Sequence, residues 1–317
     1  MSGPGEFELI RDFFAARFQG SAPEAGVVLG IGDDCALLTP PAGKTLATSV
    51  DTLVAGVHFP ATADPYRIAS RALRVNLSDL AAMNAQPLWF TLALTLPESN
   101  ADWLAGFAEG LADTAKRFDV QLVGGDTTKG PLAITIQVTG ACDRPLRRDG
   151  ASAGDSVFVS NRLGAAAAAL PIVLGEVGGS EIQRQQMDAS YYFPEPQFTV
   201  ASAIGGYASA ALDISDGLLA DLAHICEASG LGAELDLNQV PVAELAQTMS
   251  GDQARTVAVT GGDDYQLCFT VPQQHLPALN VLNLPITCIG TMTRERGIRC
   301  TLDGEPWTHA QPGYRHF

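Results

Sequence analysis

Hydrophobic and polar positions follow two different spacings along the first half of the chain. Apolar residues three and four positions apart predict helices over residues 6–18, 64–83 and 103–118. Shorter apolar runs rich in branched side chains predict strands over residues 46–50, 88–96, 120–123 and 132–138. Pro65 stands in the first turn of the second helix, where proline is favoured. The last two strands are expected to flank a turn formed by Gly124, Gly125 and Asp126.

A stretch rich in glycine, serine and alanine, residues 150–155, precedes a second pattern of elements. Strands are predicted over residues 156–160, 211–214, 233–237, 265–271 and 286–289, and helices over residues 197–208 and 217–228. We therefore expect two domains, residues 1–150 and 151–317, of the α/β or α+β class.

Composition limits the class of protein further. The 317 residues are 46% hydrophobic and 17% charged, which fits a globular protein with a large core. No stretch approaches the roughly 18 apolar residues of a membrane helix, and no secretory signal precedes the first helix, so we expect a cytoplasmic protein with no membrane partner. The formal net charge of −16 argues against nucleic acid as the main partner.

The cysteines are expected to be buried, reduced thiols, because none forms a CxxC pair and most lie within apolar runs. They are Cys35, Cys142, Cys226, Cys268, Cys288 and Cys300.

Two glycine motifs look like phosphate-binding sequences but lack required residues. Gly43-Lys44-Thr45 ends like a P-loop, yet Leu38 stands where the earlier glycine belongs, so a turn between strands is expected. Residues 30–32 begin like a dinucleotide motif, but Cys35 replaces its third glycine.

Aspartates gather at or just after the ends of apolar runs, in residues 30–34, 49–52, 76–79, 124–128 and 213–217. Ligands of open α/β sheets collect at strand ends, and carboxylates that share a cleft require cations. Mg²⁺ accepts carboxylates, water and phosphates as ligands, so it would let a chain with only three lysines bind ATP. Taken singly, each segment has an ordinary alternative: Asp216 could cap a helix, Asp79 could be solvated, and Asp33 and Asp126 could be turn residues.

Seven motifs in register resemble the thiamine-monophosphate kinases. They are GEF at 5–7, GIGDDCA at 30–36, DTLVAGVHF at 51–59, NLSDLAAM at 76–83, GGDTT at 124–128, ISDGL at 214–218 and GGDDY at 261–265. Several also occur, more loosely, in aminoimidazole ribonucleotide synthetase and selenophosphate synthetase. The resemblance implies an aminoimidazole ribonucleotide synthetase-like fold. In it, the N-terminal domain contributes strands to a barrel at a homodimer interface, and a C-terminal α/β domain completes the cleft.

The same resemblance implies phosphoryl transfer from ATP to thiamine monophosphate with several Mg²⁺ ions. The implied metal ligands are Asp34, Asp51, Asp79, Asp126 and Asp213, with Asp216 and Ser49 as further candidates, and Asp51, Asp126 and Asp213 are the expected catalytic residues. The implied ATP contacts are Gly125, Asp126, Arg148 and Ser215. The implied thiamine contacts are His58, Asp263 and an aromatic residue near the C-terminus, Tyr314 or Phe317.

Several of these assignments have alternatives. His58 could be a polar residue at a strand end, and Asp263 could belong to a loop or to a metal-side pair with Asp264. Arg148 could be one of the solvated charges of residues 144–149, with Arg147 as its competitor.

Four positions depart from the family pattern. Val50 occupies a common hydroxyl position, Asn84 a frequent glycine, and Asp263 and Gln266 two usual glutamates.

A phosphate monoester is largely dianionic at pH 7, so an acceptor phosphate needs no general base. We therefore expect direct in-line transfer without a phosphoenzyme. Two alternatives remain: another ATP-dependent enzyme of the same superfamily with a different acceptor, and a noncatalytic protein that binds Mg-ATP.

Overall fold

The computed structural model describes residues 10–18, 26–309 and 313. The chain forms two compact units. The N-terminal unit comprises Met1–Leu80 and Ala85–Asp143, and the C-terminal unit comprises Ala81–Asn84 and Arg144–Phe317. No helix in the described part of the chain is long and apolar enough to cross a membrane.

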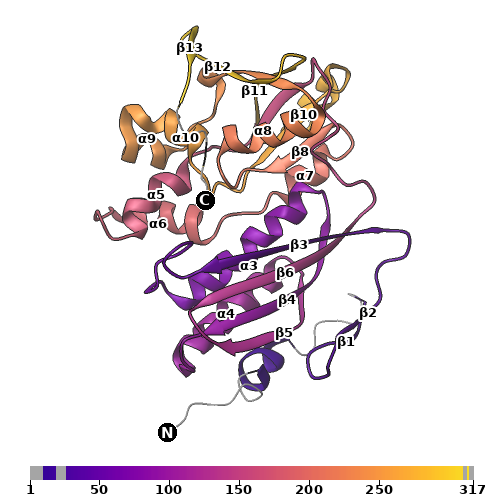
Figure 1. Ribbon diagram of the computed structural model, residues 1–317, viewed down its shortest axis with the longest axis vertical. Coiled ribbons are helices and arrows are strands. Elements are labelled where there is room, and N and C mark those ends of the chain that lie inside the picture. Colours follow the sequence, from indigo (N-terminus) through magenta and orange to yellow (C-terminus); the bar gives the residue numbers. More distant parts are fainter. Residues whose placement is uncertain (1–9, 19–25, 310–312, 314–317) are drawn as a thin grey trace. The chain divides into compact units, whose positions relative to one another are not determined.

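A four-stranded sheet forms the centre of the N-terminal unit (Figure 1). Its order is β3 (Thr45–Val54), β6 (Ala133–Cys142), β4 (Gln86–Leu96) and β5 (Gln121–Lys129). β6 pairs antiparallel with β3 and β4, whereas β4 and β5 run parallel. α3 (Pro65–Ala82) and α4 (Ala101–Arg117) cover one face of this sheet. Ile134, Ile136 and Val138 of β6 are fully buried and define the core.

Local capping explains where the two helices begin. The carboxylate of Asp64 accepts a hydrogen bond from the amide of Arg67 at 3.0 Å, and the side chain of Asn100 accepts one from Trp103 at 3.0 Å. The helices also pack closely, because a Cβ on Gly110 of α4 would lie 2.3 Å from the carbonyl oxygen of Tyr66 on α3.

Short elements complete the N-terminal unit. β1 (Val27–Leu29) pairs antiparallel with β2 (Leu37–Leu38). A π-helical turn (Ile10–Ala15) continues into α2 (Ala16–Phe18). Phe14 packs edge-on against Phe107, and Phe18 packs edge-on against Phe90. The predicted first helix is thus confirmed in its described part, and Phe7 lies outside the described residues.

The C-terminal unit is built on a seven-stranded sheet. Its order is β13 (Glu305–Trp307), β12 (Gly297–Leu302), β9 (Gly232–Asp236), β11 (Ile286–Thr293), β7 (Ser156–Ser160), β10 (Leu267–Val271) and β8 (Ala210–Asp213). Its strands pair antiparallel except for β9 and β12, which are parallel.

The helices of this unit are α5 (Ala165–Val173), α6 (Glu181–Met187), α7 (Phe198–Ile204), α8 (Leu218–Ser229), α9 (Glu244–Ser250), α10 (Ala254–Thr260) and α11 (Leu276–Val281). A 5-residue π-helical segment (Asp188–Tyr192) follows α6. Short 3₁₀ turns stand at Leu237–Gln239, Gly251–Gln253 and Gln273–His275. Phe158 of β7 stacks on Phe269 of β10 within the core.

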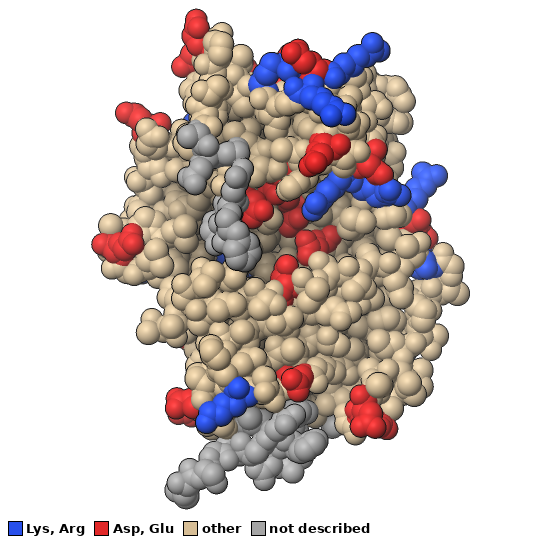
Figure 2. Space-filling model, in the orientation of Figure 1, with Lys and Arg blue, Asp and Glu red and all other residues tan. Residues whose placement is uncertain are grey.

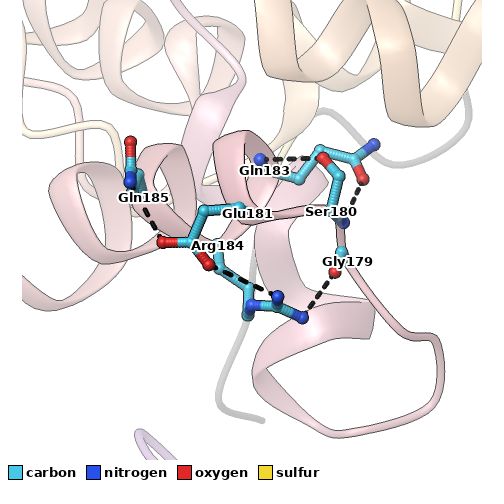
Figure 3. A network of polar contacts seen from close by, with 6 residues as sticks. All are labelled: Gly179, Ser180, Glu181, Gln183, Arg184 and Gln185. Atoms are coloured by element: carbon cyan, nitrogen blue, oxygen red, sulfur yellow. Dashed lines mark hydrogen bonds and ion pairs between the residues drawn. The ribbon is translucent and has the colours of Figure 1, made fainter.

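Helix α6 begins with a capping box at the surface (Figure 3). The Ser180 hydroxyl accepts from the amide of Gln183 at 3.2 Å, and the Gln183 side chain accepts from the amide of Ser180 at 2.9 Å. Arg184 adds a hydrogen bond to the carbonyl oxygen of Gly179 at 2.6 Å and a 3.4 Å ion pair with Glu181.

Most predicted elements are present, with shifted ends. The turn proposed at Gly124 to Asp126 is wrong, because these residues continue β5, and the chain reverses after Lys129. The turn expected at Gly43 is confirmed, and Lys44 pairs with Asp143 at 2.6 Å.

The cysteines are free thiols, as expected, but not all are buried. Cys142, Cys226, Cys268 and Cys300 are buried, whereas Cys35 and Cys288 are exposed. Cys35 lies in the exposed loop before β2, which explains the wrong expectation for this residue.

Candidate active site

Strand β3 and helix α3 together build an acidic cluster in the N-terminal unit. The Ser49 hydroxyl donates to Oδ2 of Asp79 at 2.5 Å, and the amide of Asp51 donates to Oδ1 of Asn76 at 3.0 Å. Ser49 and Asp51 share one face of β3, while Asn76 and Asp79 share one face of α3, because residues two apart in a strand and three apart in a helix point the same way. The bond from Nδ2 of Asn76 to the carbonyl oxygen of Ala72 at 2.8 Å fixes its amide.

Desolvation of the carboxyl group raises the pKa of Asp51, although the residue as a whole is exposed. Desolvation disfavours a charged carboxylate, and a nearby cation offsets that penalty. The cluster therefore has the chemistry of a cation site, with oxygen donors and a carboxylate whose ionisation a cation would favour.

Val50 does not remove a donor from this cluster. Its side chain lies on the opposite face of β3 from Ser49 and Asp51 and is 58% exposed. A hydroxyl at this position would not join the donors that face α3. Val50 therefore leaves the hydrogen bonds that join β3 to α3 unchanged.

His58 follows β3 in a tight turn. Its Nδ1 accepts a hydrogen bond from the amide of Val54 at 3.0 Å, which places the proton of the neutral ring on Nε2. The half-buried ring is thereby held in one orientation.

Asp34 and Asp126 are two further exposed members of the predicted metal set in the N-terminal unit. Asp34 lies in the loop between β1 and β2, where its amide donates to Oδ1 of Asp33 at 2.8 Å. Asp126 lies within β5. Its neighbour Gly125 runs so close to β4 that a Cβ there would lie 1.8 Å from the carbonyl oxygen of Leu92. Only glycine fits this position without moving the strand.

The C-terminal unit contributes a second acidic segment at the end of β8. Asp213 is 6% exposed and pairs with Leu267 of β10. The half-buried Ser215 and Asp216 follow in the turn that leads to α8. Figure 2 shows both acidic and basic side chains exposed on the drawn face of the C-terminal unit.

The carboxylate of Asp221, in the first turn of α8, accepts hydrogen bonds from the backbone of the segment between β8 and α8. Its Oδ2 accepts from the amides of Asp216 and Gly217 at 3.0 Å each, and the amide of Ser215 contributes as well. Burial raises the pKa of Asp221 to about 7, although these amides lower it. Asp221 therefore organises the backbone that carries Asp216.

The loop of residues 261–266 lies directly against that turn. The amide of Asp263 donates to the carbonyl oxygen of Ser215 at 2.8 Å, and the amide of Tyr265 donates to that of Ile214 at 2.8 Å. A Cβ on Gly262 would lie 2.5 Å from the carbonyl oxygen of Ser215. The structure thus brings the ISDGL and GGDDY motifs together.

The two acidic residues of this loop occupy different environments. Asp263 is half-buried and accepts from the Tyr265 hydroxyl at 2.9 Å. Asp264 is buried, and its carboxylate oxygens accept from the amide of Gly164 at 2.9 and 2.8 Å. Burial raises the pKa of Asp264 to about 8, while the amides of residues 164–166 lower it and the charge of Asp263 raises it.

The neighbouring arginines differ in their contacts. Arg147 forms a bidentate pair with Asp149, at 2.9 and 2.5 Å. Arg148 is exposed and forms no ion pair with the described residues, which leaves its guanidinium available to a ligand. Tyr314 and Phe317 lie outside the described residues. Gly313 is described, and a Cβ there would lie 2.7 Å from the carbonyl oxygen of Asp216.

Within the described residues, no group of three histidine, cysteine or acidic side chains could hold a metal ion alone. This arrangement is compatible with Mg²⁺, which is commonly held by one or two carboxylates together with water and substrate phosphates. The residues described above fit that mode of binding better than they fit a protein-only cage.

Four residues of this site were not singled out from the sequence for the contacts described here: Asn76, Asp221, Asp264 and Tyr265. Asn76 lies within the NLSDLAAM motif, and Asp221 lies on the helix that follows Asp216. The contacts of Asn76 and Asp264 join distant segments, which spacing alone does not show. Those of Asp221 and Tyr265 are local and depend on how their turns fold.

Comparison with known proteins first defines the class. Residues 32–142 match the family model for the AIR synthase related protein, N-terminal domain, and residues 152–303 match the model for its C-terminal domain. The chain is therefore an AIR synthase related protein with both domains of that class.

Relatives along the full chain define the particular family. The thiamine-monophosphate kinase of Escherichia coli K12 is 45% identical over 99% of this chain and 98% of its own length. The crystal structure of thiamine-monophosphate kinase from Stenotrophomonas maltophilia K279a has a TM-score of 0.84 at 39% identity, covering 94% of this chain and 96% of that one. A structure of AaThiL complexed with AMPPCP and TMP has a TM-score of 0.80 at 30% identity, covering 99% and 97%. The chain belongs to the thiamine-monophosphate kinase family.

Proposed function

We propose that this protein transfers the γ-phosphoryl group of ATP to thiamine monophosphate, yielding ADP and thiamine diphosphate. The observation that carries the proposal is the pair of acidic segments, one on β3 and α3 and one after β8. The second lies directly against the loop that carries Asp263. Family membership and the ligands of the AaThiL complex support the same reaction.

Mg²⁺ is the metal that we propose for the reaction. Bound between carboxylates and phosphates, it would neutralise the charge that keeps two polyanions apart. The proposed ligands in this chain are Asp34, Ser49, Asp51, Asp79, Asp126, Asp213 and Asp216. The raised pKa of Asp51 supports this choice, since a cation would compensate the cost of its burial.

The remaining residues are proposed to bind and orient the substrates. Gly125 would let the nucleotide approach the β5 backbone, and Arg148 would pair with its phosphates. Ser215 lies in the turn between Asp213 and Asp216, where it would contact the nucleotide. Nε2 of His58 would donate a hydrogen bond to the acceptor.

Recognition of thiamine is proposed to rest on charge and ring contacts. The carboxylate of Asp263 would face the cationic thiazolium. Tyr314 or Phe317 would pack on a ring of the substrate.

The attacking atom would be a phosphate oxygen of thiamine monophosphate. The monoester is largely dianionic at neutral pH, so the protein needs only to align it with ATP. We therefore propose in-line transfer without a phosphoenzyme. Incubation with γ-labelled ATP in the absence of acceptor should leave the protein unlabelled, and a trapped phosphoryl-enzyme would contradict this mechanism.

We also propose that residues 1–150 bind Mg-ATP and form a homodimer, while residues 151–317 complete the cleft. The open face of the N-terminal sheet supports dimerisation, because Leu46 and Val50 on β3 are 43% and 58% exposed there. Sedimentation should give the mass of a dimer for the wild type and a shift toward monomer for V50E. A monomeric wild type would contradict the proposal.

The reaction is tested by following ADP and thiamine diphosphate together. Purified protein with Mg-ATP and thiamine monophosphate should form the two products in equal amounts, and removal of Mg²⁺ should stop both. ATP binding without thiamine diphosphate formation would overturn the assigned acceptor.

A matched pair of variants connects this activity to the site. D126N removes a proposed metal ligand and should reduce kcat by at least about 100-fold. D143N is the control, because Asp143 is also an exposed aspartate of the N-terminal unit and pairs with Lys44 rather than with any residue of the site. Equal activity of the two variants would exclude Asp126 from the site.

A further inference from the structure

The loop of residues 261–266 has a backbone that its own residues do not favour. Asp263 has φ of 67° and Tyr265 has φ of 50°, both in the left-handed region that residues with a side chain rarely adopt. Such a conformation persists only where surrounding contacts hold it. The contacts of this loop therefore decide where the Asp263 carboxylate points.

Packing does not enclose the loop on every side, because two of its residues line an open cavity. The cavity has a volume of about 430 Å³ and is lined in part by Asp264 and Gln266, together with Asn161 and Gln197. Directed hydrogen bonds therefore take the place of a solid apolar wall. The Gln266 side chain supplies some of them, with Oε1 accepting from Asn161 at 2.8 Å and Nε2 donating to the carbonyl oxygen of Asp264 at 3.2 Å.

The Asp264 side chain fixes the loop to helix α5. The N-cap residue of α5 is Gly164, which has no side chain to cap the helix. Asp264 supplies the missing acceptor, since both of its oxygens lie within 2.9 Å of the Gly164 amide and it also accepts from the amides of Ala165 and Ala166. The loop is thus anchored at the residue next to Asp263.

The Tyr265 side chain acts on Asp263 directly. Its hydroxyl donates to Oδ1 of Asp263 at 2.9 Å. The backbone of the same residue is fixed, because its amide donates to the carbonyl oxygen of Ile214. One carboxylate oxygen of Asp263 is therefore held by the Tyr265 hydroxyl, and this contact fixes the direction in which the other oxygen points.

We propose that Asp264 and Tyr265 are positioning residues that aim the Asp263 carboxylate and thereby set the affinity for the cationic acceptor. This proposal rests on the proposed function, because it assigns Asp263 to the thiazolium side of the substrate. Neither residue takes part in phosphoryl transfer itself, so their loss should act on acceptor binding before it acts on the chemical step.

The test compares D264N and Y265F with two matched controls. S180A removes the cap of another helix in the same unit, α6 (Figure 3). Y66F removes another tyrosine-to-aspartate hydrogen bond, the 2.9 Å contact between Tyr66 and Asp113. For each protein, kcat and the KM values for thiamine monophosphate and ATP are measured separately.

We expect D264N and Y265F to raise KM for thiamine monophosphate by about tenfold and about threefold, respectively, while KM for ATP stays within about twofold. The controls should leave both KM values unchanged. Phenylalanine keeps nearly the volume of tyrosine, so Y265F tests the orientation of the Asp263 carboxylate even if D264N does not fold. An unchanged KM for thiamine monophosphate in the folded variants, even with a lower Tm for D264N, would overturn the proposal.

Hydrogen exchange separates this proposal from the assignment of the substrate. The amides of residues 263–265 should exchange faster in D264N than in wild type or S180A, whatever the acceptor is. Faster exchange in D264N, combined with a wild type that makes no thiamine diphosphate, would reject the function and keep the anchor. Unchanged exchange would reject the anchor alone.

Discussion

The Ser49 hydroxyl lies 2.5 Å from Oδ2 of Asp79 and joins the edge strand of the N-terminal sheet to helix α3. This bond orients one carboxylate oxygen toward β3. It also brings Asp79 to the strand that carries Asp51. The pair thus defines the geometry of the proposed metal cluster.

Removal of this hydroxyl should weaken the response to Mg²⁺. S49A should raise the Mg²⁺ concentration for half-maximal activity by about two- to tenfold, the effect of one hydrogen bond. T48A is the control, because Thr48 lies on the opposite face of β3 and bonds Thr139 at 3.2 Å. Activity is measured as a function of Mg²⁺ concentration for S49A and T48A. The same half-maximal concentration in the two variants would exclude Ser49 from the cluster.

Alanine substitutions at adjacent glycines should have very different effects. G125A places a Cβ 1.8 Å from the carbonyl oxygen of Leu92, so it should cost about 3 kcal/mol of stability and weaken ATP binding. G124A meets nothing within 4 Å and should behave like the wild type. Urea unfolding and ATP titration check the pair. Similar stability of the two would show that β4 and β5 separate easily.

The buried Asp221 should matter through the turn that it holds. D221N weakens the acceptor for the amides of Asp216 and Gly217, so we expect about a tenfold higher Mg²⁺ requirement. D155N is a matched control, since Asp155 is equally buried and accepts from Ser152 and Ser209. An equal change in both variants would mean that Asp221 contributes to stability only.

Stability should depend on pH through Asp264. Burial raises its pKa to about 8, so the unfolded chain releases this proton at lower pH than the folded chain does. The stabilising effect is complete below the ordinary pKa of 3.8 and is lost as the pH rises toward 8. The asparagine side chain in D264N cannot ionise, so this variant should lose less stability than the wild type as the pH rises through that window. Urea midpoints at several pH values measure the difference, and parallel curves would refute it.

The elements of the fold were largely predictable because their periodicities are strong. The helix over α3 and the strand over β7 were expected close to their observed bounds. Residues 124–126 were misassigned because two glycines usually mark a turn, whereas here one of them permits close pairing of β5 with β4. Asn84 illustrates the opposite case, since its φ of 54° explains why the family often has glycine there.

The members of the candidate site were predictable as motifs but not as contacts. Ser49 and Asp79 are 30 residues apart, and only the packing of β3 on α3 joins them. Asp264 looked like one half of an acidic pair with Asp263. Its carboxyl group instead accepts from the amide of Gly164, the N-cap residue of α5, which lies 100 residues earlier.

The order of strands in the C-terminal unit has a consequence for synthesis of the chain. β7 is the first strand of its sheet to leave the ribosome. Its two neighbours in the sheet, β10 and β11, are made much later, and only β12 and β13 follow them. Ser160 and Gln266, which bond across this region, are 106 residues apart. The strand must therefore wait unpaired while the helices between them emerge, and such long-range pairing is slow. A nascent chain that stalls before residue 267 would therefore expose an apolar strand whose neighbours in the sheet have not yet been made.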